Sequence, residues 1–270
     1  MKTFGRELSS KDHWESLGST YTEELENRYH THRLLVIRAL IPPELFQSGK
    51  KIFEFGCGDA VLFPDFLQSG ALIDGIDISS IMIQKAGLRL GKERSHLAQV
   101  GDVNNMKKIK SNSLDAVISF NVLAYLTDRE EEIFYKETSR ILKPGGYLIV
   151  THSNELFDMF SLNKYTVEFM NRNLISTTKN QNKIKQLLTY ADSPENPVSY
   201  NIRENPLAYK YKLAGYGFQE LSQEFINLHE CPPPVLKEKQ FPDTLGYEEC
   251  DKWKLMFICS TFGSCSIKKN

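Results

Sequence analysis

The chain has 270 residues, of which 41% are hydrophobic and 11% aromatic, which is enough for a packed core and unlike a disordered chain. Its formal net charge of −1 provides no general electrostatic attraction to nucleic acid, and no apolar run reaches the length of a membrane span. The N-terminus lacks an apolar leader, and the five cysteines form no C-x-x-C pair, so we expect a cytoplasmic protein with reduced thiols.

The first part of the chain alternates between helical and strand-like patterns. Residues 1–20 are polar, and we expect no regular element there before Trp14. The expected elements that follow are a helix over 21–40, a strand over 51–55, a helix over 59–69 capped by Asp59, a strand over 72–76, a helix from Ser79 or Ser80 to Leu90, strands over 96–100 and 114–120, a helix over 128–142 and a strand over 146–152. This alternation predicts a parallel sheet covered on both faces.

The regular alternation of strand-like and helical segments ends after Thr151. We expect a helix over 205–215, a sixth strand over 218–228 and a final apolar strand over 253–261. Between them lie two insertions, 153–200 and 229–250, which are too long to be simple connections.

The most specific pattern is the turn after the first strand. The run K-I-F-E-F-G-C-G-D-A over 51–60 ends a strand near Glu54 and continues with Gly56 and Gly58. Glycines here allow positive φ and let a ligand approach the backbone, where the N–H groups of the next helix also point. This is not a dinucleotide fingerprint, because Val61 stands where G-x-G-x-x-G needs its last glycine.

Three further motifs follow in register. They are a second strand ending in Asp77, a third strand ending in Asp102, and the segment 142–150, in which a Pro-Gly-Gly turn leads into another strand. In this order, the four motifs resemble the class I S-adenosylmethionine-dependent methyltransferases, most closely over residues 50–152.

The resemblance implies a Rossmann-like α/β fold, with a seven-stranded, mostly parallel sheet, helices on both faces and the last strand antiparallel. We expect a single methyltransferase domain over 1–270, with an N-terminal helical segment over 1–45, a core over 50–152, and cap insertions over 153–200 and 229–250. The insertions would lie over the carboxyl edge of the sheet, where ligands bind in open α/β folds.

The resemblance also assigns S-adenosylmethionine as cofactor and names its contacts. Asp77 would accept hydrogen bonds from both ribose hydroxyls, although it could instead cap the next helix. Asp102 would accept from the adenine amine, or else cap a turn, and Val103 would offer its N–H to the ring. The remaining expected contacts are Tyr21, Glu54, Gly56, Cys57, Gly58, Ile78, Met82, Phe120 and Asn121. Of these, Glu54 would order the glycine loop, and Met82 could equally be a core residue.

Methyl transfer to a hydroxyl needs a base, whereas other acceptors need mainly alignment in a dry site. His152 ends the fifth strand and His229 follows the sixth, so both are base candidates, and either could be an ordinary hydrogen-bonded histidine. No cluster has the spacing of a catalytic metal site. The stretch after Phe120 lacks the N-P-P-Y motif of enzymes that methylate amino groups of nucleic acids.

The leading hypothesis is an enzyme that methylates a hydroxyl of a small molecule. A sugar or sugar-linked acceptor is expected, because the segment 205–218 resembles methyltransferases of surface-polysaccharide biosynthesis. The alternatives are an amine or carboxyl acceptor, and a non-catalytic protein that binds S-adenosylmethionine. We expect a monomer or homodimer, with neither nucleic acid nor membrane as partner.

Overall fold

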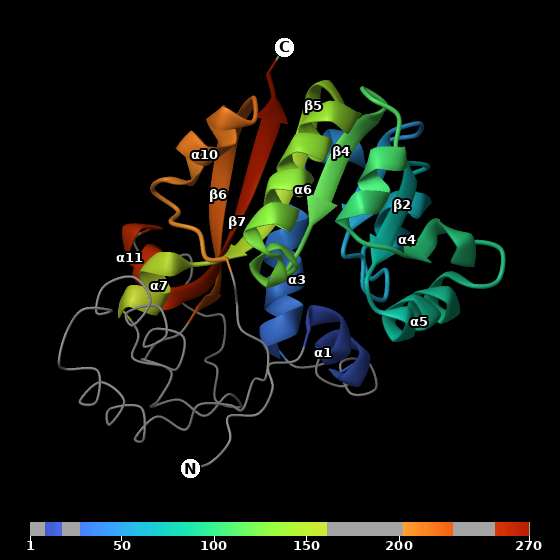
Figure 1. The fold of residues 1–270 in the computed structure, drawn as a ribbon, viewed down its shortest axis with the longest axis horizontal. Coiled ribbons are helices and arrows are strands. Elements are labelled where there is room, and N and C mark those ends of the chain that lie inside the picture. The colour runs from blue at the N-terminus through green and yellow to red at the C-terminus, as the bar shows by residue number, and fades with distance from the viewer. Residues whose placement is uncertain (1–8, 18–27, 161–201, 229–251, 270) are drawn as a thin grey trace.

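The computed structural model describes residues 9–17, 28–160, 202–228 and 252–269 (Figure 1). Seven strands form one sheet with the order β3-β2-β1-β4-β5-β7-β6. They are β1 (Lys51–Phe55), β2 (Leu72–Asp77), β3 (Ala98–Val100), β4 (Leu114–Ser119), β5 (Leu142–Ser153), β6 (Phe218–Leu228) and β7 (Cys259–Lys268).

The sheet is parallel except at its last strand in the chain. β1 pairs in parallel with β2 and β4, β3 with β2, and β4 with β5, whereas β7 runs antiparallel to both of its neighbours, β5 and β6. The predicted fold class, including the reversed final strand, is therefore confirmed. The carboxyl ends of β1 to β5 consequently meet at one edge of the sheet.

Helices cover both faces. They are α1 (Ser10–Leu17), α3 (Arg28–Leu40), α4 (Phe63–Gln68), α5 (Ser80–Leu90), α6 (Asp128–Ile141), α7 (Glu155–Phe160), α10 (Tyr209–Gly215) and α11 (Lys252–Ile258). Short 3-10 helices are η1 (Pro43–Leu45), η2 (Ser95–Leu97), η3 (Val103–Lys108) and η4 (Leu123–Tyr125). Figure 1 shows α6 and α10 in front of the strands and α3 behind them.

The core consists of two apolar clusters, one on each face of the sheet. In β4, Ala116 and Ile118 join residues of α3, α4 and α5, while Val117 joins residues of α6 and α10. Buried parallel strands read as nearly continuous apolar runs because both faces are covered. This is why the strands could be located from the sequence.

The helix expected over 59–69 is wrong at its start. Ala60 has a φ of +59°, and helix α4 begins only at Phe63, with Pro64 in its first turn. Proline suits the first turn because its missing N–H would have no intrahelical partner there. Asp59 does not cap this helix, and its carboxylate lies 2.5 Å from the guanidinium of Arg89 on α5.

The final strand expected over 253–261 is also wrong. Helix α11 occupies Lys252–Ile258, and the strand β7 runs later, over Cys259–Lys268. Short apolar runs fit either periodicity, and here the helix buries Leu255 against the cluster shared by α6 and α10. The sixth strand, predicted over 218–228, is confirmed.

Two further expectations need correction. Residues 1–20 do contain a regular element before Trp14, because α1 begins at Ser10. The helix expected from 205 starts at Tyr209, and Asn205 instead closes a turn by accepting a hydrogen bond from the backbone N–H of Leu207 at 3.0 Å.

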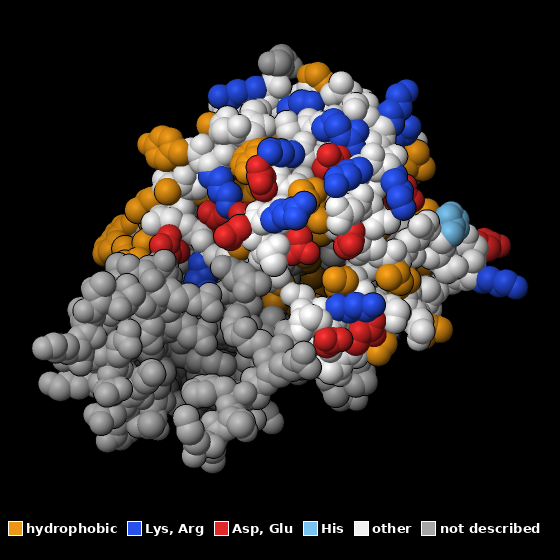
Figure 2. Space-filling view, viewed as in Figure 1, with side chains coloured by type: hydrophobic (Ala, Val, Ile, Leu, Met, Phe, Trp, Pro, Cys, Tyr) orange, Lys and Arg blue, Asp and Glu red, His pale blue; other side chains and the backbone are white. Residues whose placement is uncertain are grey.

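The cap insertions lie mostly outside the described residues. Their described ends include α7, which follows β5, and a parallel bridge between Asn154 and Glu204. Among the described helices, none has both the length and the apolar character needed to cross a membrane. On the face shown in Figure 2, basic and acidic side chains are interspersed over the described part of the chain.

Candidate active site

A pocket of about 850 Å³, counted out to its open mouth, lies at the carboxyl edge of the sheet. Its walls come from the ends of β1 to β4, from α1 and α5, and from the segment that enters α6. It is lined by Ser10, Trp14, Phe55, Gly56, Gly58, Ile76, Asp77, Ile78, Met82, Gly101, Asp102, Val103, Phe120, Asn121, Val122, Tyr125, Leu126 and Glu130. The position is the one where open α/β sheets bind ligands.

The glycine loop after β1 forms one wall. Gly56 and Gly58 have φ values of +75° and +53°, a region that favours glycine. The backbone N–H groups of Gly56 and Cys57 donate to the carbonyl of Ile76 at 2.7 and 2.9 Å, which fixes the loop against β2. The loop thereby presents bare backbone to the pocket.

Asp77 stands at the end of β2 with its carboxylate held in place. One oxygen accepts from the N–H of Gly58 and the other from the N–H of Ser79, each at 2.9 Å. Burial raises the pKa of Asp77, and the two backbone hydrogen bonds oppose that rise. Ser79, not Asp77, caps α5, because its hydroxyl accepts from the N–H of Met82 at 3.3 Å. Each Asp77 oxygen keeps a second lone pair for a ligand.

Glu54 and Cys57 lie behind the loop and do not line the pocket. Glu54 is 4% exposed, and its Oε2 has no hydrogen-bond partner among the described residues. Burial, followed by the nearby charges of Asp77 and Asp59, raises the pKa of Glu54 well above its usual range. Burial raises the pKa of the Cys57 thiol as well, so it is not a thiolate nucleophile.

Asp102 and Val103 close the far end of the pocket, after β3. One carboxylate oxygen of Asp102 accepts from the N–H of Asn104 at 2.8 Å, and Asn105 completes a capping box on η3. Asp102 therefore caps a turn and lines the pocket at the same time, so the two sequence interpretations are compatible. Val103 is 2% exposed and packs its side chain into the core.

The end of β4 supplies Phe120 and Asn121. Asn121 has a φ of +58°, and its backbone N–H donates to the hydroxyl of Thr151 on β5 at 2.8 Å. Asparagine tolerates this conformation better than most residues. The bend turns the chain toward Val122 and η4, which line the next part of the pocket.

Helix α1 contributes pocket residues that we did not predict, Ser10 and Trp14. The Ser10 hydroxyl donates to the carbonyl of Tyr125 at 3.0 Å, and the rings of Trp14 and Tyr125 meet edge to face at 5.4 Å. On the other side, Glu15 accepts from the N–H and hydroxyl of Ser80 at 2.8 and 2.9 Å. The helix thus bridges two loops at the sheet edge, and an isolated Trp14 was its only sequence signal.

The pocket brings together nine of the twelve residues expected to bind the cofactor. These are Gly56, Gly58, Asp77, Ile78, Met82, Asp102, Val103, Phe120 and Asn121. Glu54 and Cys57 lie behind it, and Tyr21 is outside the described residues. The lining residues missed from the sequence are Ser10, Trp14, Phe55, Ile76, Gly101, Val122, Tyr125, Leu126 and Glu130.

Of the two base candidates, His152 does not line the pocket. His229 lies outside the described residues. His152 is 2% exposed, and its ring packs 4.5 Å from Tyr209 and 5.3 Å from Phe262. Burial lowers the pKa of His152 well below its usual value.

The residues present fit S-adenosylmethionine. A carboxylate anchored on backbone N–H groups suits a diol, and the bare backbone at Gly56 leaves no room for a side chain, because a β-carbon there would overlap Val122. The apolar residues Ile78, Met82 and Val103 line the part of the pocket where a flat ring would lie. Pockets of this kind, mostly apolar with a few placed polar groups, are typical of cofactor sites.

Comparison with known proteins points the same way. Residues 53–150 match the family model of a methyltransferase domain. A ubiquinone biosynthesis O-methyltransferase of Bradyrhizobium diazoefficiens is 28% identical over 137 residues, 50% of this chain and 53% of that protein. One of Xanthomonas oryzae is 28% identical over 127 residues, 46% and 52% of the two chains. The chain thus spans about half the length of the curated relatives it matches.

Solved structures share the fold across almost the whole chain. A Haloferax volcanii putative methyltransferase, in complex with the Trm112 activator, covers 97% of this chain and 98% of its own at 16% identity, with a TM-score of 0.60. The magnesium protoporphyrin IX methyltransferase of Synechocystis, with bound S-adenosylhomocysteine, covers 96% and 98% at 14% identity, with a TM-score of 0.57. Residues 53–150 therefore match a methyltransferase domain, and the fold of the chain is that of solved methyltransferases, one of which holds S-adenosylhomocysteine.

Proposed function

We propose that this protein is an S-adenosylmethionine-dependent methyltransferase that methylates a hydroxyl group of a small molecule. The observation that carries the proposal is the anchored carboxylate of Asp77 beside the bare glycine backbone of Gly56 and Gly58. It offers acceptors for the ribose diol next to a surface that a ligand can approach closely.

The cofactor supplies a methyl carbon on a positively charged sulfur, and its transfer leaves a neutral thioether. The chain's own task is to align the acceptor oxygen with that carbon and to exclude water. Trp14, Phe120 and Tyr125 place aromatic surface around the pocket, which supports a dry reaction site. As the oxygen forms its bond to carbon, the hydroxyl proton must pass to a base.

Oxygen as the acceptor atom is supported by the relatives, which are named O-methyltransferases. The sugar-linked acceptor rests only on the resemblance of residues 205–218 and draws no support from these relatives. For the base we propose to test His229 first, because the ring of His152 is enclosed by Tyr209 and Phe262.

Calorimetric titration with S-adenosylmethionine, S-adenosylhomocysteine and NAD tests the cofactor. We expect micromolar binding of the first two, no binding of NAD, and a loss of about 100-fold or more in Asp77→Ala, since charge-assisted hydrogen bonds are among the stronger ones. Asp12→Ala, on the outer side of α1, is the matched control. Unchanged cofactor affinity in Asp77→Ala would exclude the ribose assignment.

Formation of S-adenosylhomocysteine from S-adenosylmethionine in the presence of phenol, sugar or amine acceptors tests the reaction. Turnover with a hydroxyl acceptor that falls in His229→Gln, without loss of cofactor affinity, would support the proposal. Turnover only with amines would replace it by N-methylation. Cofactor binding without turnover of any acceptor would indicate a non-catalytic binding protein.

A further inference from the structure

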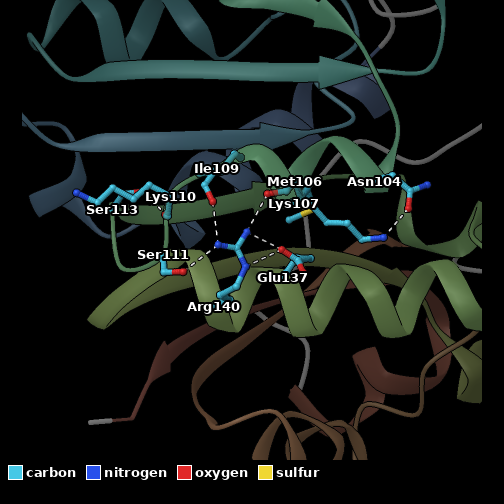
Figure 3. Close-up of polar contacts among 9 residues, drawn as sticks. All are labelled: Asn104, Met106, Lys107, Ile109, Lys110, Ser111, Ser113, Glu137 and Arg140. Atoms are coloured by element: carbon cyan, nitrogen blue, oxygen red, sulfur yellow. Dashed lines mark hydrogen bonds and ion pairs between the residues drawn. The ribbon is translucent and has the colours of Figure 1, made fainter.

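Arg140 lies in the last turn of α6 and is tied to the segment that forms the end of the pocket. Its Nη1 donates to the carbonyl of Ile109 at 2.8 Å and to the hydroxyl of Ser111 at 2.9 Å, and its Nη2 donates to the carbonyl of Met106 at 3.1 Å (Figure 3). One guanidinium group therefore fastens three successive points of the chain.

The guanidinium is itself held in orientation. Glu137, one turn earlier on α6, accepts from Nε at 2.8 Å and lies 2.6 Å from Nη2 (Figure 3). Arginine presents its donors in a rigid planar fork, so fixing one edge on a carboxylate aims the remaining donors. A lysine at this position would offer a single point of charge and could not reproduce the pattern.

Arg140 binds the C-terminal end of η3 through the carbonyl of Ile109, the residue after the helix, and the carbonyl of Met106, which also accepts from the N–H of Ile109 at 3.0 Å. The opposite end of η3 begins with the pocket residues Asp102 and Val103. The helix is only six residues long, so a movement at one end is passed to the other. The Asp102 capping box fastens the pocket end, and Arg140 fastens the far end.

We propose that Arg140 is a positioning residue for recognition of the cofactor's adenine ring. It holds η3 against α6, and thereby keeps Asp102 and Val103 where the adenine amine and ring would meet them. The inference rests on the proposed function, in which Asp102 accepts a hydrogen bond from that amine. It gives α6 a role in selecting adenine over other nucleobases, although Arg140 itself does not line the pocket.

The test compares binding of S-adenosylhomocysteine with that of S-inosylhomocysteine, in which an oxygen replaces the adenine amine. Wild-type protein should prefer the adenine compound. In Arg140→Gln, the affinity for S-adenosylhomocysteine should fall about tenfold, the affinity for the inosine compound should change less, and the preference should shrink. Lys136→Gln is the matched control, because Lys136 lies on the same helix and pairs only with Glu132 among the described residues.

A milder pair of variants covers the case in which Arg140→Gln does not fold. Arg140→Lys keeps the charge without the fork, and Glu137→Gln keeps the fork without its anchor, so both should reduce the preference in part. Equal weakening of both compounds in these variants would show a purely structural role and overturn the inference. A wild-type protein that binds both equally would overturn it too, while leaving the proposed cofactor intact. Binding of neither by wild type would instead refute the proposed function.

Discussion

Val122 occupies the space that a side chain on Gly56 would need, because a β-carbon built on Gly56 would overlap Cγ2 of Val122. Two requirements thus meet at Gly56, a positive φ of +75° and a close approach from the end of β4. Gly145 in the Pro-Gly-Gly turn has nearly the same φ, +74°, but no atom of the described residues lies within 4 Å of a β-carbon built there. Comparing substitutions at Gly56 and Gly145 therefore separates the free-energy cost of the left-handed backbone conformation from the cost of the steric overlap.

Replacing Gly145 with Ala should therefore destabilise the protein by about 1–2 kcal/mol, the cost of the left-handed conformation. Gly56→Ala should cost about 1–3 kcal/mol more, because Val122 must move, and it should abolish cofactor binding because Val122 lines the pocket. Denaturant unfolding and calorimetry measure the two effects. Equal destabilisation by the two substitutions would contradict the overlap.

Glu54 should make the stability depend on pH. Its pKa is raised by burial, so the folded protein holds this proton more tightly than the unfolded chain does. Stability from this group is then fully present below the ordinary carboxyl pKa of about 4.5 and is lost as the pH rises through the raised value. Glu54→Gln should gain stability over wild type as the pH increases. Glu132→Gln, at an exposed ion pair, should show no such trend.

Lys212 forms ion pairs with two buried carboxyl groups that lie on different segments. Its Nζ lies 2.6 Å from Glu131 on α6 and also bonds Glu204, and both acidic side chains are 11% exposed. Burial raises the pKa of Glu204 to about 7. The contribution of Glu204 to the free energy of unfolding therefore falls as the pH rises from about 4.5 to about 7.

Lys212→Met should destabilise the protein by about 2–3 kcal/mol at pH 8, somewhat less than the value for a fully buried pair because the lysine is 27% exposed. The loss should be smaller at pH 5, where Glu204 is protonated. Comparing the unfolding midpoints of wild type and Lys212→Met at pH 8 and at pH 5 tests this prediction. A loss that does not change with pH would mean that Glu204 stays ionised throughout.

The contact between Glu15 and Ser80 should tighten cofactor binding, since it holds α1 across the pocket. Glu15→Ala should weaken S-adenosylhomocysteine binding about three- to tenfold, the effect of a few hydrogen bonds, and should leave the unfolding midpoint nearly unchanged. Asp12→Ala is the control, because Asp12 bonds Ser9 within the first turn of the same helix. Equal affinities in the two variants would remove α1 from the binding site.

The cofactor pocket could be predicted from the sequence where its parts are local. Gly56, Asp77 and Asp102 each follow a buried strand, and strands of a parallel sheet bring their carboxyl ends to one edge. Asp102 was open to two interpretations because a turn cap and a pocket wall use the same carboxylate, and the structure contains both.

The parts that escaped prediction depend on contacts between distant segments. Trp14 lies in a polar stretch, and α1 is held by Ser80 and Tyr125, which are 65 and 115 residues from their partners in the chain. The final strand was misplaced because the apolar run of α11 is too short to show a period. Arg140 was missed for the same reason as Trp14, since its partners in η3 lie about 30 residues away.

The bridge between Asn154 and Glu204 closes a loop at its base. Asn154 also donates to the carbonyls of Met256 and Cys259 at 2.7 and 2.8 Å, so this base is fastened to α11 and β7. Because the entropic cost of closing a loop rises only slowly with its length, the enclosed stretch can be lengthened, shortened or exchanged with little cost to the sheet. Changes in the length of this loop should therefore leave the glycine loop and the anchored carboxylate of Asp77 undisturbed.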